Sequence, residues 1–406
     1  MKVRSLAPSV FLPAFIYEVG NGAIAPVIAL TALSLGASPA EAGVILTLLG
    51  VGQILGNLPS AFLVSRLGDR RAMMVAAAVA TGALVVCFLA SGLSEFALAV
   101  LVIGACNATF YLGRQHYIIE VVPPTMRAVA LSTLGGSHRI GLFLGPFAGA
   151  VVIHLFSMRA AYLVAVVAAT AAALSLLTIP DVQSQEVKAG VEAGPTARAP
   201  LKAVLASHRE VFLTLGFAVL AVGAARSARQ TVIPLWAAHI GLNATTTSII
   251  FGVATAVDMA LFYPAGRVMD QYGRLAVAIP SMVILGGATA LLPLTHGVLT
   301  LALGAIAMSF GNGLGSGIIM TLGADVAPAD ARVSFLSVWR TMSDTGSAIG
   351  PLVVAALAAA WTLAAGVVAI GSVGLLAALG MWRWVPLHSA YANRRMIRAA
   401  RGGATS

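Results

Sequence analysis

Residues Ala61–Arg70 read AFLVSRLGDR, and residues Gly266–Leu275, 205 positions later, read GRVMDQYGRL. The same offset aligns further pairs in the same order along the chain: Gly36 with Gly241, Asn107 with Asn312, Glu120–Arg127 with Asp325–Arg332, Leu131 and Ser132 with Leu336 and Ser337, and Gly141, Gly145 and Pro146 with Gly346, Gly350 and Pro351. One offset that relates loops and apolar runs alike indicates an internal repeat. The chain is therefore expected to consist of two similar halves.

The composition requires that most of the chain lies in lipid. Of its 406 residues, 59% are hydrophobic and 9% are charged, against about 25% charged in an ordinary soluble protein. This excludes a soluble enzyme, a disordered chain and a nucleic-acid-binding surface, since the net charge of +10 is spread in short clusters between apolar runs. Cys87 and Cys106 both lie within apolar runs, so no disulfide framework and no metal site is expected.

Twelve apolar runs are long enough to cross a bilayer, which takes about 20 residues per helix. Because the runs are continuous rather than alternating, a β-barrel is excluded. The first run follows Lys2 and Arg4 but is too long for a signal peptide, so it is interpreted as an uncleaved span. The predicted helices cover residues 11–34, 41–64, 72–92, 96–118, 127–157, 160–180, 210–237, 244–268, 275–295, 298–322, 332–359 and 362–383.

The repeat and the spans together predict an all-α polytopic membrane protein of two six-helix bundles, related by a pseudo-two-fold axis along the membrane normal. Nearly all loop Lys and Arg residues fall on one side, and the other side holds only Arg159. The positive-inside rule therefore places both termini in the cytoplasm, most simply of a bacterial inner membrane. The predicted parts are an N-terminal bundle (1–180), a cytoplasmic linker (181–209), a C-terminal bundle (210–386) and a basic tail (387–406) that lies on anionic headgroups or is disordered.

The loop sequence of the second half resembles a motif of a known family. Gly266–Arg274 is similar to the cytoplasmic loop motif of the major facilitator superfamily, G-x-x-x-D-(R/K)-x-G-(R/K). Gly266, Asp270, Gly273 and Arg274 match, and Gln271 replaces the basic residue. In the first-half copy Arg66, Gly68 and Arg70 survive, whereas Ala61, Ser65 and Asp69 depart from the motif. The resemblance implies a conformational latch, in which glycine allows close helix approach and the Asp bonds to a helix N-terminus and a nearby Arg.

A second resemblance lies in the fifth predicted helix. The stretch GLFLGPFAGA (Gly141–Ala150) is similar to the antiporter motif of this family, whose end reads G-x-x-x-G-P-x-x-G-G. Gly141, Gly145, Pro146 and Gly149 match. The resemblance points to the twelve-helix drug:proton antiporter branch and to export, with a smooth glycine face against which the opposite half rocks. The Arg that this family places near Gly104 is absent. Arg114 is close enough to the cytoplasmic end to snorkel to the surface, and a structural role is expected for it.

Charged side chains within the spans are functional candidates, since a charge in the bilayer core costs a few kcal/mol at least. Proton coupling needs a carboxylate that gains and loses a proton as its surroundings change. Glu18, Asp258 and Asp344 are the candidates, with Glu18 first because its helix lines the pore in the family. Asp344 is four residues after Arg340 and an intrahelical ion pair is expected there. For each carboxylate the alternative, which is equally favoured, is a fixed structural ion pair between helices.

The substrate cavity is expected to draw on basic, polar and aromatic residues within the spans. The candidates are His138, Arg139, Arg226, Arg229, Arg340, Asn21, Asn107, Tyr111, Asn312 and Trp339. Five arginines stand against three acids in the spans. This excess favours a neutral, amphiphilic or anionic substrate.

The predicted function is proton-coupled export of small drug-like or metabolite molecules by alternating access. One alternative is an organic-anion or metabolite importer of the same fold, and another is a lipid scramblase or a membrane enzyme. No HExxH, GxSxG or P-loop motif is present, so neither an enzyme nor an ATP-driven pump is favoured. The expected partners are substrate, protons and lipid, with no nucleic acid, no cofactor and no metal, and the chain is expected to act as a monomer.

Overall fold

The computed structural model describes residues 11–122, 124–177, 201–328 and 331–396, and within these ranges every element is helical. Twelve helices or helix pairs are long and apolar enough to cross a membrane. They coincide within a few residues with the twelve predicted spans, which confirms the all-helical polytopic class. Lys2 and Arg4, most of the predicted linker 181–209 and the end of the predicted tail lie outside the described residues.

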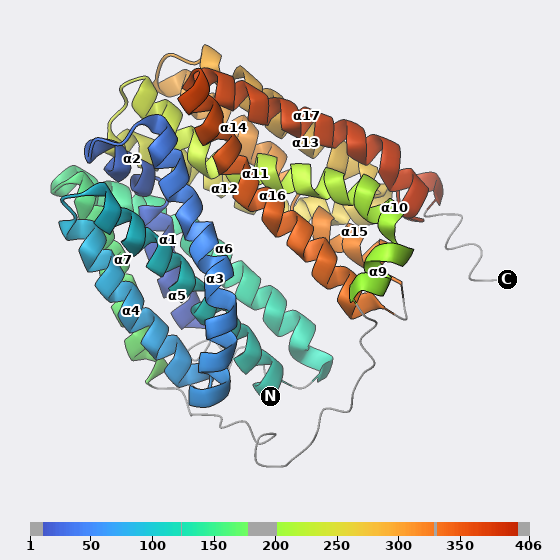
Figure 1. The fold of residues 1–406 in the computed structure, drawn as a ribbon, viewed down its shortest axis with the longest axis horizontal. Coiled ribbons are helices and arrows are strands. Elements are labelled where there is room, and N and C mark those ends of the chain that lie inside the picture. Colours follow the sequence, from blue (N-terminus) through green and yellow to red (C-terminus); the bar gives the residue numbers. More distant parts are fainter. Residues whose placement is uncertain (1–10, 123, 178–200, 329–330, 397–406) are drawn as a thin grey trace. The chain divides into compact units, whose positions relative to one another are not determined.

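The chain divides into two compact units. The first holds the helices of the N-terminal half, together with residues 237–252, and its helices run alongside one another (Figure 1). In this unit α1 packs on α6 and α7, α3 on α5, and α4 on α5 and α7. Its helices are α1 (Leu12–Ile24), α2 (Val27–Ser34), α3 (Pro39–Leu67), α4 (Asp69–Leu89), α5 (Leu93–Val121), α6 (Pro124–Leu155) and α7 (Ala161–Leu176).

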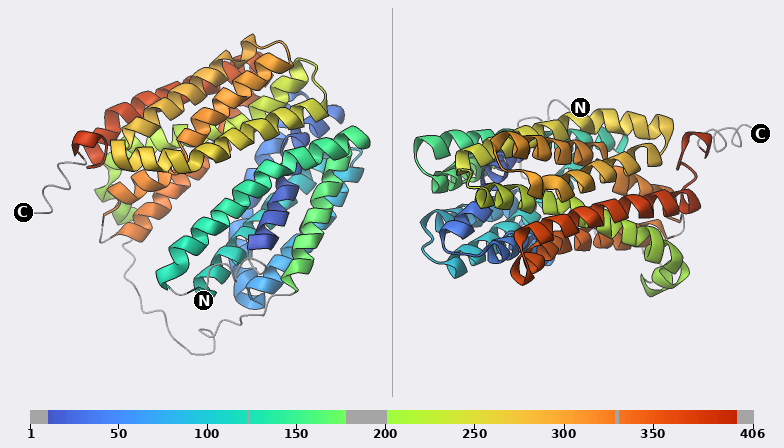
Figure 2. Two further views of the ribbon diagram at one scale, coloured as in Figure 1. Left: turned by 180° about the vertical axis from the view of Figure 1, so that it is seen from behind. Right: turned by 90° about the horizontal axis from the view of Figure 1, so that it is seen from above.

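The second unit holds the helices of the C-terminal half, from α9 onward, and Figure 2 gives two further views of these long helices. Here α13 packs on α14 and α17, and α16 packs on α17. Its helices are α9 (Leu201–Ser207), α10 (Arg209–Val211), α11 (Phe217–His239), α12 (Ala244–Tyr272), α13 (Leu275–Leu291), α14 (Val298–Leu314), α15 (Ile318–Val326), α16 (Arg332–Ala360) and α17 (Leu363–His388). A five-residue π-helix, Phe212–Gly216, joins α10 to α11. The predicted linker thus contains a short helix, α9, that the sequence interpretation had not included.

Local sequence explains where several helices begin and break. Ser38 caps α3, because its hydroxyl accepts the Glu41 amide while the Glu41 carboxylate accepts the Ser38 amide at 2.7 Å. The first span is not one helix, since α1 ends before Pro26 and α2 begins after it. The tenth span is also broken, at Gly317, whose φ of +85° ends the helical path between α14 and α15.

The repeat predicted from the sequence recurs in the backbone. Gly36 and Gly241 both have positive φ, +93° and +77°, and so do Gly68 and Gly273, at +79° and +100°. Positive φ is accessible to glycine at little cost. The turns at equivalent positions of the two halves therefore use the same residue type for the same conformation.

Helix contacts repeat as well. In the first unit a Cβ at position 145 would collide with the carbonyl oxygen of Val19, and in the second a Cβ at position 350 would collide with that of Ala224. Ala224 follows Val19 by 205 positions, as Gly350 follows Gly145. Gly141 against Phe15 and Gly346 against Leu220 form a second matching pair. Each half thus packs its first helix on its fifth through the same glycine positions.

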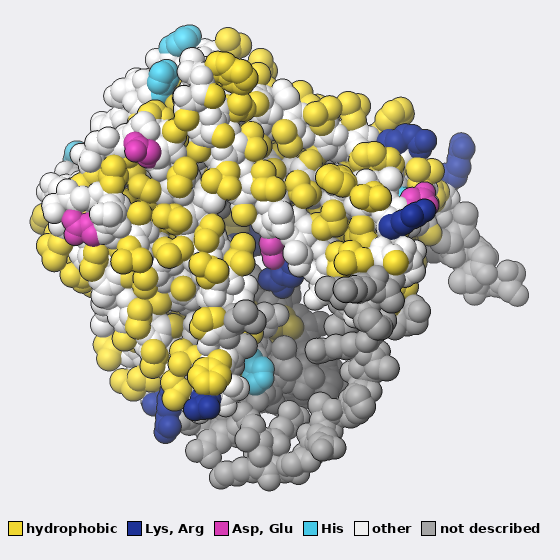
Figure 3. All heavy atoms as spheres, viewed as in Figure 1, with side chains coloured by type: hydrophobic (Ala, Val, Ile, Leu, Met, Phe, Trp, Pro, Cys, Tyr) yellow, Lys and Arg dark blue, Asp and Glu magenta, His cyan; other side chains and the backbone are white. Residues whose placement is uncertain are grey.

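The outer surface is apolar over most of the face drawn in Figure 3, where the few charged side chains lie in small groups. Large hydrophobic side chains such as Leu98 and Val167 are 61% and 67% exposed. In water such surface would be costly, whereas lipid tails solvate it. This distribution agrees with an integral multi-pass membrane protein.

Candidate functional site

The carboxylate of Glu18 forms the centre of a buried polar cluster in the first unit. Glu18 lies on α1 and is completely buried. Its Oε1 lies 3.2 Å from Nη1 of Arg114 on α5 and 2.9 Å from Nδ1 of His138 on α6. Three helices therefore meet at one carboxylate oxygen.

The second oxygen of Glu18 accepts neutral donors. The Tyr111 hydroxyl lies 3.4 Å from Oε2 and the Asn21 amide nitrogen 3.3 Å from it. Asn21 is also 3.5 Å from Oδ1 of Asn107, which accepts the Tyr17 hydroxyl at 2.8 Å. The network satisfies the buried charge from several directions, as burial in a membrane requires.

Arg114 belongs to this cluster, and its predicted reach to the cytoplasmic surface is wrong. The residue is only 8% exposed, and its guanidinium lies 4.4 Å from the ring centre of Tyr111. Asn107, Tyr111 and Arg114 are spaced four and three residues apart, so they share one face of α5. This spacing in the sequence indicates that Arg114 faces the same side as Asn107 and Tyr111. The distance of Arg114 from the helix end does not indicate that.

Glycines of α6 make room for the cluster. A Cβ at position 141 would lie 2.6 Å from both the Glu18 Cβ and the Phe15 carbonyl oxygen. Positions 145 and 149 meet the α1 backbone near Ala23 in the same way, and Pro146 lies within α6 beside them. The glycine face predicted to contact the opposite half therefore packs on α1 of its own half, and it brings His138 close to Glu18.

The contact between Glu18 and His138 brings together two side chains that can each carry a proton. At 2.9 Å, Oε1 and Nδ1 are within hydrogen-bond distance of each other. Either the imidazole donates to a carboxylate, or a protonated Glu18 donates to the ring nitrogen. Nδ1 also lies 3.4 Å from Nη2 of Arg114, so the guanidinium charge acts directly on this pair.

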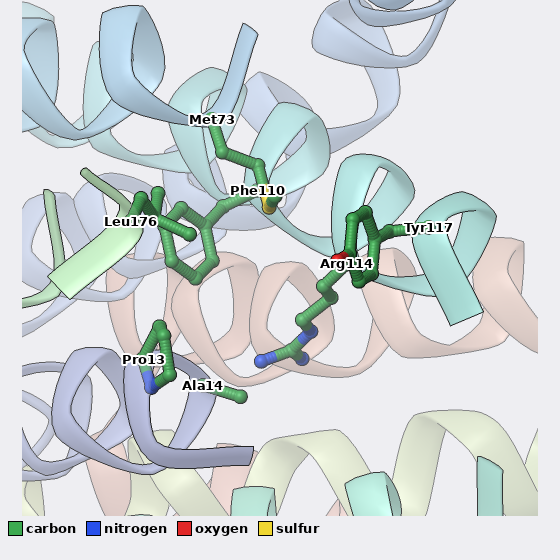
Figure 4. Close-up of a pocket in the computed structure, with 7 residues that line it drawn as sticks. All are labelled: Pro13, Ala14, Met73, Phe110, Arg114, Tyr117 and Leu176. Atoms are coloured by element: carbon green, nitrogen blue, oxygen red, sulfur yellow. The ribbon is translucent and has the colours of Figure 1, made fainter. Parts of the chain in front are cut away.

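A small cavity adjoins the cluster at Arg114. Its volume is about 10 Å³, close to what one water molecule occupies. Figure 4 shows the Arg114 guanidinium extending into the space between Tyr117 and the residues Pro13 and Ala14 at the start of α1. Water at this place would be next to the cation that pairs with Glu18.

A second buried cluster lies in the C-terminal unit. Arg229 of α11 is 5% exposed, and its Nη2 lies 3.4 Å from Oδ2 of Asp258 on α12. Asn312 of α14 donates to the same Oδ2 at 2.8 Å and accepts Nε of Arg226 at 2.8 Å. Ser309 of α14 accepts a hydrogen bond from Nη1 of Arg229. The structure thus brings together four predicted residues, Arg226, Arg229, Asp258 and Asn312, and adds Ser309.

Other predicted site residues make contacts of their own. Arg340 and Asp344 form the expected intrahelical pair at 3.7 Å, with side chains that are 76% and 58% exposed. Trp339 is buried, and its indole nitrogen donates to the Ile319 carbonyl at 2.8 Å. Arg139 is half-buried on α6. Within the described ranges no group of three or more His, Cys, Asp or Glu side chains is placed to hold a metal ion.

The loop motif of the second half is built around Arg274. Its Nε and Nη2 bind the two oxygens of Asp325 at 2.8 and 3.2 Å, while Asp270, a motif residue with a 75% exposed side chain, lies 3.4 Å away. Partial burial opposes the charged form, but the hydrogen bonds and charge of Asp325 outweigh it and raise the pKa of Arg274. The main partner of the motif arginine is therefore Asp325, which was not among the predicted site residues.

The chain that follows α17 is bound to this loop. The amides of Arg274 and Leu275 donate to the carbonyls of Tyr391 and Ala392, both at 3.0 Å. The Ser389 hydroxyl donates to Asp325 at 3.2 Å. Within the predicted tail, Ser389, Tyr391 and Ala392 are therefore held on this loop, and α17 extends to His388.

The first-half copy of the loop motif uses different contacts. Arg66 is exposed and lies over the Phe62 ring at 4.7 Å. Asp69, the first residue of α4, is buried and lies 3.0 Å from Nδ1 of His116. In the second copy, Gly266 has open space where a Cβ would be, whereas Gly273 has close neighbours.

Replacing Gly273 with alanine is expected to destabilise the protein by about 2 kcal/mol or more, since both backbone conformation and space forbid a Cβ. Gly273 has φ +100°, and a Cβ would lie 2.5 Å from the Asn393 Cα. The melting temperature of the purified protein measures this loss. Gly266→Ala is the matched control within the same motif, and equal melting temperatures of the two variants would contradict the docking of residues 389–396.

Comparisons with known proteins agree with this architecture. A family model described as "Major Facilitator Superfamily" matches residues 10–257 and 215–401. Among solved structures, a D-xylose–proton symporter is 16% identical with a TM-score of 0.70, and covers 95% of this chain and 98% of its own. The nucleoside transporter NupG is 14% identical with a TM-score of 0.71, and covers 93% of this chain and 96% of its own. A bacterial homologue of the human lysosomal transporter Spinster is 13% identical with a TM-score of 0.70, covering 99% and 98%. No curated protein sequence matches significantly.

Proposed function

Because the chain belongs to the Major Facilitator Superfamily, we propose that this membrane transporter is a proton-coupled secondary transporter that exports small drug-like or metabolite molecules by alternating access. The observation that carries the proposal is the buried Glu18 carboxylate, whose Oε1 lies against both Arg114 and His138. The substrate leaves the protein chemically unchanged, and the energy comes from the proton gradient.

The coupling follows from what a proton does to the buried cluster. When Glu18 is ionised, its charge holds Arg114 of α5 and His138 of α6 against α1. Protonation of Glu18 removes that attraction and leaves Arg114 without its counter-ion, so the contacts of three helices at this carboxylate respond to one proton. A conformational equilibrium biased in this way is what alternating access requires.

Export is favoured by the resemblance of Gly141–Gly149 to the antiporter motif. This motif packs on α1, and its Gly141 lies directly against Glu18. This supports the drug:proton antiporter branch. Import of an organic anion with protons is the second candidate, supported by the arginines of the C-terminal unit. In either case the proposed setting is a bacterial inner membrane, with both termini in the cytoplasm and a monomer as the working unit.

The proposal is tested with the purified protein in liposomes that contain a pH-sensitive dye, using a panel of cationic, neutral and anionic compounds. A transported compound is expected to drive protons against its own direction of movement and to show saturable counterflow. Proton movement in the same direction would identify symport. Saturable counterflow that moves no protons would contradict coupling, and accelerated flipping of a fluorescent lipid without counterflow would indicate a scramblase.

A further inference from the structure

The ion pair between Arg229 and Asp258 is only half formed. At Arg274, the edge of the guanidinium made by Nε and Nη2 binds both oxygens of Asp325, at 2.8 and 3.2 Å. At Arg229, the same edge makes a single contact of 3.4 Å, from Nη2 to Oδ2 of Asp258. A second hydrogen bond would join Nε of Arg229 to Oδ1 of Asp258. Both atoms are buried, and neither has a hydrogen-bond partner among the described residues.

An unfinished pair of this kind is costly within a membrane. A buried guanidinium nitrogen and a buried carboxylate oxygen each carry a desolvation penalty when they lack a partner. Arg229 is 5% exposed, so surrounding solvent does not supply that partner. The edge of Arg229 therefore has the geometry to bind a planar anion bidentately, as such edges do.

The charges of the cluster also favour an added anion. Arg226 and Arg229 carry two positive charges and Asp258 one negative charge, while Ser309 and Asn312 are neutral. One monoanion would bring the total to zero. Asn312 donates to Asp258 at 2.8 Å, so Asp258 keeps a partner when Arg229 turns to another ligand.

The internal repeat shows that this charge is particular to the second half. Asn21 donates to Asn107 in the first half, and at the positions 205 residues later Arg226 donates to Asn312. The same inter-helix contact thus carries a neutral amide in one half and a cation in the other. Conversely, the position of Glu18 is occupied by Gly223. The second half therefore has an arginine where the first has Asn21, and no acid where the first has Glu18.

We propose that the Arg229 cluster (Arg226, Arg229, Asp258, Ser309 and Asn312) binds the carboxylate of an organic monoanion, and that Asp258 is the built-in counter-ion which this carboxylate replaces on Arg229. The inference rests on the proposed function only in taking this anion to be the transported substrate. Arg229 is the specificity-determining residue, and Asp258 competes with the ligand.

The test measures binding to the purified full-length protein by thermal-shift titration, without a membrane or a gradient. The probes are 4-phenylbutyrate, its neutral amide and the corresponding primary amine, which share one scaffold. The carboxylate is expected to bind about ten- to a hundredfold more tightly than the amide, the size of a charged hydrogen-bond pair. Arg229→Gln should abolish this preference and Asp258→Asn should increase it, whereas Arg267→Gln, a change of an exposed arginine, should leave it unchanged.

Equal binding of carboxylate and amide, or a preference that survives Arg229→Gln, would overturn the proposal. If Arg229→Gln does not fold, Arg226→Gln and the charge-balanced double variant Arg229→Gln/Asp258→Asn answer the same question. A transporter that proves uncoupled from protons but still selects the carboxylate through Arg229 would refute the proposed function alone.

Discussion

Glu18→Gln is expected to abolish transport driven by a pH gradient while substrate exchange at equal pH stays measurable. Glutamine has the size of glutamate and can keep a hydrogen bond to His138, but it neither carries a charge nor takes up a proton. Initial rates of gradient-driven flux should fall roughly tenfold or more, as loss of a coupling free energy above about 1.4 kcal/mol implies. Dye-reported proton movement and radiolabel counterflow, measured in the same liposomes, separate the two activities.

The control for this variant is Glu95→Gln. Glu95 is exposed at the start of α5, and glutamine retains its capping contact with Gly92. Because Glu18→Gln leaves Arg114 buried without its counter-ion, the double variant Glu18→Gln/Arg114→Gln guards against a folding defect. Proton coupling that persists in both would move the coupling role to Asp258 or Asp344.

Gly145→Ala is expected to cause the largest loss among single methyl additions to α6. A Cβ there would lie 2.6 Å from both the Gly22 Cα and the Ala23 amide nitrogen. These are backbone atoms of α1, which cannot move aside as a flexible side chain does. Overpacking of this kind costs about 1–3 kcal/mol, and it would push α1 and Glu18 away from His138. Both the melting temperature and proton-coupled flux should fall.

Gly136→Ala is the matched control, because it lies on the same helix with open space at its Cβ. Alanine there should raise helix propensity slightly and leave flux intact. A Gly145→Ala protein as stable and active as Gly136→Ala would show that α1 and α6 are not held at this distance in the working transporter.

Much of the fold was readable from the sequence, because span length and the 205-residue offset follow from local composition and spacing. The twelve spans matched closely, and equivalent glycines share turn conformations and helix contacts. The breaks beside Pro26 and at Gly317 were missed, since an apolar run does not show whether its helix is continuous. An apolar run predicts that a segment lies in lipid, but it does not predict whether the helix in that segment is broken.

The site was predicted as residues rather than as contacts. Glu18 and His138 were both candidates, yet their pairing depends on how α1 and α6 are rotated against each other, which residue spacing along the chain does not fix. Arg114 was judged by its depth alone, although its face of α5 was decisive. Asp325 was not a predicted site residue, because it follows a predicted span and carboxylates are common in loops. Its contact with Arg274 depends on the fold.

The docked residues after α17 have a practical consequence for handling the protein. Ser389, Tyr391 and Ala392 hold the loop at Gly273 and Arg274 through side-chain and backbone bonds. A purification tag or fluorescent reporter joined directly after His388 would replace these bonds with unrelated sequence. Fusion points for such labels belong beyond Met396, so that the labelled protein retains the loop as the native chain holds it.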